Sequence, residues 1–107
     1  MEYKDDSFLV VTEKDTINFS GKIEKSEYTE LSDFLDKFNA EHKGTNLDIN
    51  LSKLAFLNSS GIRTIALFLM KCKKRVKLII DSTIAWQKYG IEPLVALRPQ
   101  GEIVVEK

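Results

Sequence analysis

The 107-residue sequence has only one cysteine, one histidine and two prolines. Cys72 cannot form an internal disulfide, and its place in an apolar helical pattern predicts a buried, unreactive thiol. His42 alone cannot supply the paired imidazoles of a common zinc site, and the acidic residues show no clustered spacing that would replace them. We therefore expect no metal site and no cofactor.

An excess charge and long apolar runs are also lacking. The 16 lysines and arginines are balanced by 16 aspartates and glutamates, so the net charge gives no reason to expect nucleic acid as a partner. No apolar run is long enough to insert into a membrane, and Met1 is followed by charged residues rather than by a secretory signal. We expect a cytoplasmic protein, a compartment that suits a single thiol.

Motifs of common enzymes are missing as well. The five glycines are scattered and form neither usual phosphate-binding loop, and there is no Gly-x-Ser-x-Gly nucleophile elbow. His42 lies between Glu41 and Lys43 where a helical pattern ends, so we interpret it as a solvated residue rather than a general base. We expect no catalytic residues and no enzymatic activity.

The composition, with 43% hydrophobic and 30% charged residues, is typical of one globular domain spanning residues 1–107. Apolar residues alternate or cluster as in strands at 8–11, 17–23, 47–51, 76–80 and 103–105. Helical spacing follows Ser26, a suitable N-cap, and recurs at 59–73 and 84–89. The order β-β-α-β-α-β-α-β predicts an α/β fold. We expect a single-layer, mixed, mainly parallel sheet of about five strands, with helices packed on it.

The most informative segment is Asn58-Ser59-Ser60-Gly61, where an apolar strand pattern gives way to an apolar helix pattern. Several backbone N–H groups in the first turn of a helix have no intrahelical partner, and a serine hydroxyl can cap them. A phosphate on such a serine would place negative charge where the helix dipole favours it. On the residues alone, an unmodified capping serine and a phosphorylated serine are both open.

The helix pattern that follows is apolar at every position from Ile65 to Met70. One buried stripe cannot accommodate all six side chains, so we expect Leu67 and Phe68 to point partly away from the sheet. Either a neighbouring helix covers them or they form an exposed patch for a partner.

Residues 47–62, from Leu-Asp-Ile-Asn-Leu-Ser to Asn-Ser-Ser-Gly-Ile, resemble the signature of STAS domains, the anti-sigma factor antagonist family. The family pattern is an apolar strand ending in Asp-Leu-Ser, a short link to Phe, and Asp-Ser-Ser-Gly-Leu opening a helix. The order of strands and helices extends the resemblance over nearly the whole chain. Asn58 replaces the acidic residue of the motif, and Arg63 stands where the family often has a small residue.

In bacterial members that regulate sigma factors, an anti-sigma factor that is also a serine kinase phosphorylates the first serine, and a PP2C-type phosphatase reverses the reaction. The unmodified protein binds the anti-sigma factor and frees the sigma factor for transcription. The resemblance thus implies Ser59 as the phosphorylation site, with Ser60 and Gly61 shaping the turn. It also implies a partner-binding helix surface at Ile62, Arg63, Leu67 and Phe68.

Two hypotheses follow. The first is a regulatory binding module switched by phosphorylation of Ser59, in which Arg63, four residues later, can pair with the phosphate. The alternative is an accessory subunit of an ABC transporter complex, a role of some STAS domains, in which Ser59 contacts the ATPase and is never modified.

Overall fold

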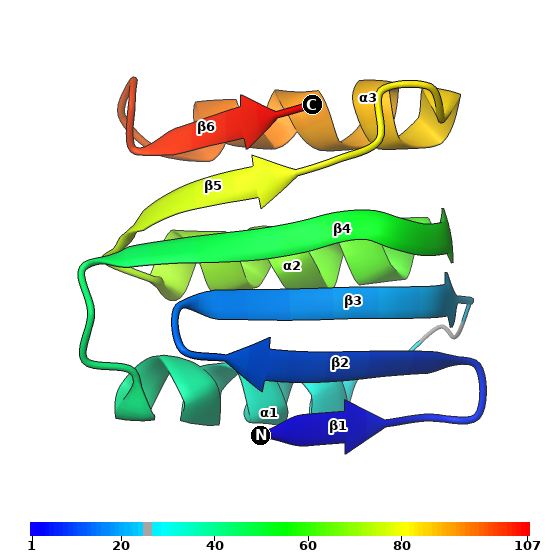
Figure 1. The fold of residues 1–107 in the computed structure, drawn as a ribbon, viewed down its shortest axis with the longest axis horizontal. Helices are drawn as coiled ribbons and strands as arrows, with labels where there is room; N and C mark the ends of the chain where they lie inside the picture. The colour runs from blue at the N-terminus through cyan, green and yellow to red at the C-terminus, as the bar shows by residue number, and fades with distance from the viewer. Residues whose placement is uncertain (25–26) are drawn as a thin grey trace.

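The computed structural model describes residues 1–24 and 27–107. Within those ranges the chain forms a six-stranded sheet with three α-helices and a short 3-10 helix on one face (Figure 1). The strands are β1 (Glu2–Lys4), β2 (Phe8–Glu13), β3 (Thr16–Ile23), β4 (Asn46–Leu57), β5 (Arg75–Ile79) and β6 (Ile103–Glu106). The helices are α1 (Thr29–Glu41), α2 (Ser59–Lys71), α3 (Ala85–Ile91) and the 3-10 helix η1 (Glu92–Leu97).

The strands lie side by side in their order along the chain. β1, β2 and β3 pair antiparallel through tight turns, and each pairing from β3 to β6 is parallel. Right-handed crossovers that all step in one direction along a sheet place every helix on the same face, as Figure 1 shows. The predicted mixed, mainly parallel α/β fold is confirmed, with β1 as a strand that the sequence did not indicate.

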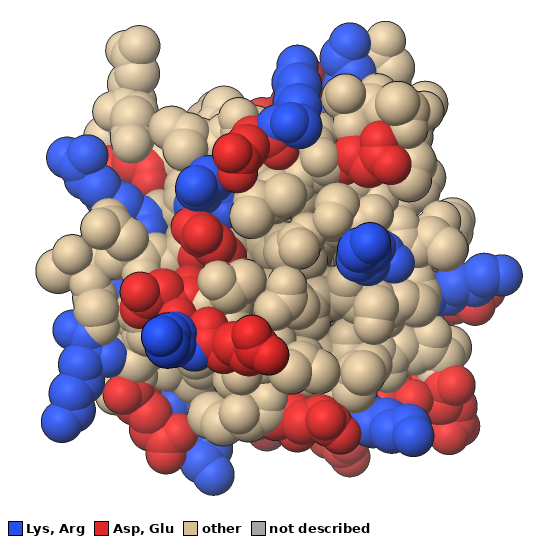
Figure 2. Space-filling model, viewed as in Figure 1, with Lys and Arg blue, Asp and Glu red and all other residues tan. Residues whose placement is uncertain are grey.

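The core lies between the sheet and the helices. On β3, Ile17 and Phe19 face inward and are buried, whereas Asn18 and Ser20 between them are half-buried on the opposite face. That face has no helix over it, and a cross-strand hydrogen bond of 3.3 Å runs from Asn50 Nδ2 to Asn18 Oδ1. Figure 2 shows the uncovered face, where acidic and basic side chains are interspersed among neutral ones. Neither sign of charge dominates it.

Strand β4 is longer than its neighbour β5, which pairs only with Asn46–Asn50. The second half of β4 pairs with β3, and its register shifts there by bulges. Gly21 of β3 sits at one bulge with φ of +96°, and a Cβ at this position would lie 2.4 Å from the Ser7 carbonyl oxygen. The close approach of β2 and β3 here therefore requires glycine.

The first helix begins later than the sequence suggests. α1 starts at Thr29 with Tyr28 at its N-cap position, and the Tyr28 side chain makes no capping hydrogen bond. Ser26, which the sequence favours as the N-cap, lies outside the described residues.

Candidate functional site

The predicted passage from strand to helix at residues 57–59 is present. β4 ends at Leu57, Asn58 occupies the N-cap position, and Ser59 is the first residue of α2. The turn lies at the carboxyl end of the parallel strands, from which α2 runs back behind the sheet (Figure 1).

Asn58 caps the helix. Its side-chain Oδ1 accepts a hydrogen bond of 2.8 Å from the Gly61 N–H, and its backbone N–H donates to the Ile23 carbonyl oxygen over 3.0 Å. The Asn58 carbonyl oxygen accepts the first intrahelical bond, from the Ile62 N–H, at 3.0 Å. Asparagine is among the best N-cap residues, so the turn needs no serine for this purpose.

Ser59 is exposed, and its hydroxyl makes no hydrogen bond to residues 1–24 or 27–107. Ser60 is half-buried, and its carbonyl oxygen accepts a hydrogen bond of 3.0 Å from Thr64 Oγ1. Because Asn58 performs the capping, the Ser59 hydroxyl has no structural role in the turn and is open to solvent.

Gly61 is buried where α2 approaches the ends of β3 and β4. A Cβ on Gly61 would lie 2.4 Å from Leu57 Cδ1 and 2.8 Å from Ile23 Cγ2. Both distances are shorter than any normal van der Waals contact. Glycine therefore lets the first turn of α2 come close enough to β3 for Asn58 to contact both elements.

One face of α2 is exposed along its length. Ser59, Arg63, Leu67 and Met70 recur at helical spacing on this face, and we call them the α2 stripe. Leu67 is 43% exposed and Met70 is 58% exposed. The Arg63 guanidinium makes no ion pair or hydrogen bond with the described part of the chain. The stripe thus combines a hydroxyl, an unpaired cation and two apolar side chains.

Of the two alternatives that the sequence left open for Phe68, burial under neighbouring elements or an exposed patch, the exposed patch is excluded. Phe68 is 3% exposed and belongs to the core. Ile62 is half-buried and lies near Gly90 of α3. Of the four residues that the resemblance assigned to partner binding, Arg63 and Leu67 are exposed. Met70, which the sequence reasoning missed, extends their face.

Helix α3 forms hydrogen bonds with the part of β4 that extends beyond its pairing with β5. The Gln87 side chain, completely buried, donates from Nε2 to the Leu54 carbonyl oxygen over 2.9 Å and accepts from the Asp81 N–H over 2.7 Å. Trp86 Nε1 donates to the Ala55 carbonyl oxygen over 3.2 Å. These bonds satisfy carbonyls of β4 that β5 does not reach. A glutamine on a short helix carries no sequence signal for this role.

His42 is not the solvated residue that the sequence predicted. Its side chain is 6% exposed, stacks on the Phe38 ring with 5.3 Å between centroids, and places Nε2 2.6 Å from Asp15 Oδ1. This contact joins the end of α1 to the turn between β2 and β3. The residue lies at the opposite edge of the sheet from Ser59, so it cannot serve that turn as a base.

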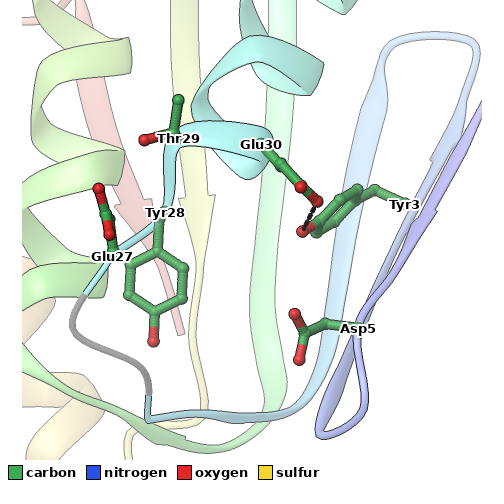
Figure 3. A pocket seen from close by; sticks show the side chains of 6 residues that line it. All are labelled: Tyr3, Asp5, Glu27, Tyr28, Thr29 and Glu30. Atoms are coloured by element: carbon green, nitrogen blue, oxygen red, sulfur yellow. Dashed lines mark hydrogen bonds between the residues drawn. The ribbon is translucent and has the colours of Figure 1, made fainter.

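A cavity of about 320 Å³ lies between the start of α1 and the β1–β2 hairpin (Figure 3). The described residues that line it are Tyr3, Asp5, Glu27, Tyr28, Thr29 and Glu30. The Tyr3 hydroxyl donates to Glu30 Oε2 over 3.4 Å, as the dashed line in Figure 3 marks. Among the described residues the lining contains carboxylates, phenols and a hydroxyl but no basic side chain, and these residues do not include the Ser59 turn.

Residues 1–24 and 27–107 contain no group of three or more histidine, cysteine, aspartate or glutamate side chains arranged to hold a metal ion. None of the helices in these same ranges combines the length and the apolar character that crossing a bilayer requires. Cys72 is buried, as its sequence pattern predicted.

Neither protein-family models nor curated proteins give a match to this sequence. Among solved structures, the fold is similar to that of an anti-sigma factor antagonist from Mycobacterium paratuberculosis, with a TM-score of 0.63 and 18% sequence identity. The similarity covers 92% of this chain and 84% of that chain. The chain therefore has a STAS-like fold, as the motif at residues 47–62 predicted.

Proposed function

We propose that this protein is a non-enzymatic regulatory module of the anti-sigma factor antagonist type, formed by a single domain. It binds a protein partner through the α2 stripe and is switched by reversible phosphorylation of Ser59. The observation that carries the proposal is the exposed Ser59 hydroxyl at the first position of α2, left free because Asn58 caps the helix. The exposed Arg63, Leu67 and Met70 provide the adjoining contact surface.

The switch follows from local electrostatics. A kinase would transfer the γ-phosphoryl group of ATP to Ser59 Oγ, with release of ADP and the hydroxyl proton. A phosphatase would return the hydroxyl by hydrolysis and release inorganic phosphate. The added charge of about −1.5 to −2 is compatible with the start of a helix. A partner that closes over the stripe must desolvate that charge, so its affinity falls on modification.

The family resemblance names the partners of this proposal. They are an anti-sigma factor that is also a serine kinase, and a PP2C-type phosphatase, in the cytoplasm of a bacterium. The STAS-like fold and the Asn-Ser-Ser-Gly turn support this assignment. Asn58 differs from the acidic residue of the family motif in charge but supplies the same type of capping oxygen.

The decisive experiment compares wild type, Ser59→Ala and Ser59→Glu as baits in a lysate of the native host, followed by binding assays with the purified partner. We expect a serine kinase to bind wild type and Ser59→Ala, to lose at least tenfold in affinity for Ser59→Glu, and to phosphorylate Ser59 as seen by mass spectrometry. Ser7→Glu, at another exposed serine, is the matched control and should bind as wild type does. Equal affinity of the purified partner for Ser59→Glu and wild type would refute the switch.

The neutral Asn58 favours a second candidate, because it removes a negative charge from the surface that a kinase of this class would recognise. In that case the same stripe contacts the ATPase subunit of an ABC transporter complex, and Ser59 stays unmodified. Copurification with such an ATPase, together with absence of phosphate on Ser59 in cells, would select this function over the first.

A further inference from the structure

Arg63 lies one helical turn after Ser59 on the exposed face of α2. Residues four apart on a helix have Cβ atoms about 5–6 Å apart, close enough for a guanidinium to reach a phosphate. Several other cations of the chain do have intramolecular partners. Lys71 Nζ is 3.2 Å from Asp36 Oδ2, and Arg98 Nη2 is 2.9 Å from Glu102 Oε1. Arg63 has no such partner among residues 1–24 and 27–107, so the unmodified fold does not use its charge.

No group on α2 competes for this guanidinium. The first turn of α2 contains no acidic residue, and the neighbouring Asn58 is neutral. Its amide oxygen is engaged with the Gly61 N–H. Farther along the stripe, Leu67 and Met70 are apolar. A phosphate on Ser59 would therefore be the first anion on this face of the helix.

We propose that Arg63 is the internal partner of a phosphate on Ser59. In the unmodified protein the guanidinium is available to an acidic group of the binding partner, next to an apolar surface for Leu67 and Met70. In the modified protein it folds back onto the phosphate. This inference rests on the proposed function, which supplies the modification, and it adds the residue through which the modification changes the surface.

The change in charge indicates why the pairing matters. The stripe carries a formal charge of +1 from Arg63 before modification. Adding a phosphate of about −1.5 to −2 brings the stripe to about −0.5 to −1. Phosphorylation thus reverses the sign of the stripe and also withdraws its only cation. A partner with an acidic group opposite Arg63 loses an attraction and gains a repulsion in one step.

The test uses phosphoserine installed at position 59 of the full chain by genetic code expansion, so that no kinase is needed. The phosphate is titrated by 31P NMR at low salt in the otherwise wild-type protein, in Arg63→Gln and in Arg75→Gln. Arg75 is the matched control, since it is exposed and stands beside Asn46 at the opposite end of β4 from Ser59. Far-UV circular dichroism verifies that all three proteins are folded.

We expect the second phosphate pKa to be lower with Arg63 present than in Arg63→Gln, by about 0.3 unit, because an i,i+4 ion pair favours the dianion. The phosphate pKa in Arg75→Gln should equal that of the otherwise wild-type phosphoprotein. The difference should shrink in 1 M salt, where the screening length falls to about 3 Å. Equal titration of Arg63→Gln and the otherwise wild-type phosphoprotein would overturn the pairing. Because the phosphate is installed, that result is independent of whether cells ever modify Ser59, which mass spectrometry of the native protein decides separately.

Discussion

Replacing Gly61 by alanine tests the geometry of the Ser59 turn directly. Gly61 lies in the first turn of α2, and the new methyl group would meet Leu57 Cδ1 at 2.4 Å and Ile23 Cγ2 at 2.8 Å. Leu57 Cδ1 is the end of a flexible side chain, although its surroundings are buried. Ile23 Cγ2 is attached to Cβ of a completely buried, β-branched residue, and it can move only together with β3.

Two effects of opposite sign determine the size of the change. Alanine in a helix is favoured over glycine by about 0.8–1 kcal/mol. Overpacking a well-packed site costs about 1–3 kcal/mol. We therefore expect Gly61→Ala to lower the free energy of unfolding by between about 0 and 2 kcal/mol, with the start of α2 pushed away from β3 and its Asn58 cap weakened.

Gly90→Ala is the matched control in α3. A Cβ at Gly90 would meet only Ile62 Cδ1, at 3.6 Å, an ordinary van der Waals distance. The helical preference for alanine then acts alone, and the variant should equal or exceed wild type in stability. Urea unfolding monitored by circular dichroism measures both. A Gly61→Ala variant as stable as Gly90→Ala would show that the close approach of α2 to β3 is not a constraint.

Three further outcomes are expected. Asn58→Ala should lower the unfolding free energy by about 1 kcal/mol through loss of the cap, whereas Asn58→Asp should keep it; equal urea midpoints for Asn58→Ala and wild type would contradict the capping role. Leu67→Asp should abolish partner binding, and it should change the free energy of unfolding by about 0.5 kcal/mol or less. Phe68→Ala should lower the free energy of unfolding by about 3–5 kcal/mol. Urea unfolding measures the stability of both variants. Hydrogen bonds from the Thr83 hydroxyl and then its backbone N–H lower the pKa of Asp81, so Thr83→Val should raise that pKa in a carboxyl NMR titration. Because the folded protein has the lower Asp81 pKa, ionised Asp81 stabilises the fold at any pH above the pKa of an unperturbed aspartate. This stabilisation is lost as the pH falls through the lowered pKa, so Thr83→Val should lose less stability in acid than wild type does.

Most of the fold could be predicted because its strands and helices have distinct apolar periods. Strand β1 could not, for physical reasons. It has three residues, Glu2–Lys4, and Tyr3 is the only one that packs against the core. Charged residues on both sides of it suit a short edge strand, because they discourage pairing with another chain. With a single apolar residue, the strand is too short to establish the period of two that would have indicated it.

The sequence located the candidate site along the chain, but it did not show which side chains of α2 face solvent. Ile65 to Met70 is a run without polar residues, so no side chain within this run marks which of its positions face solvent. A shift of one residue rotates a helix position by about 100°, which separates the exposed Leu67 from the buried Phe68. The role of Gln87 lay beyond sequence reasoning because the residue that it anchors, Leu54, lies 33 positions away in the sequence.

Which of the neighbouring residues Asn58, Ser59 and Ser60 is the N-cap determines how a phosphate on Ser59 would act. Asparagine and serine are both good N-caps, so Asn58-Ser59-Ser60 allowed several starting points for α2. If Ser59 were the cap, a phosphate would replace the capping hydroxyl, and modification would change the stability of the helix. With Asn58 as the cap, the bond to the Gly61 N–H is independent of the Ser59 hydroxyl. A phosphate on Ser59 would then leave this capping bond in place and change the surface that the proposed partner would meet.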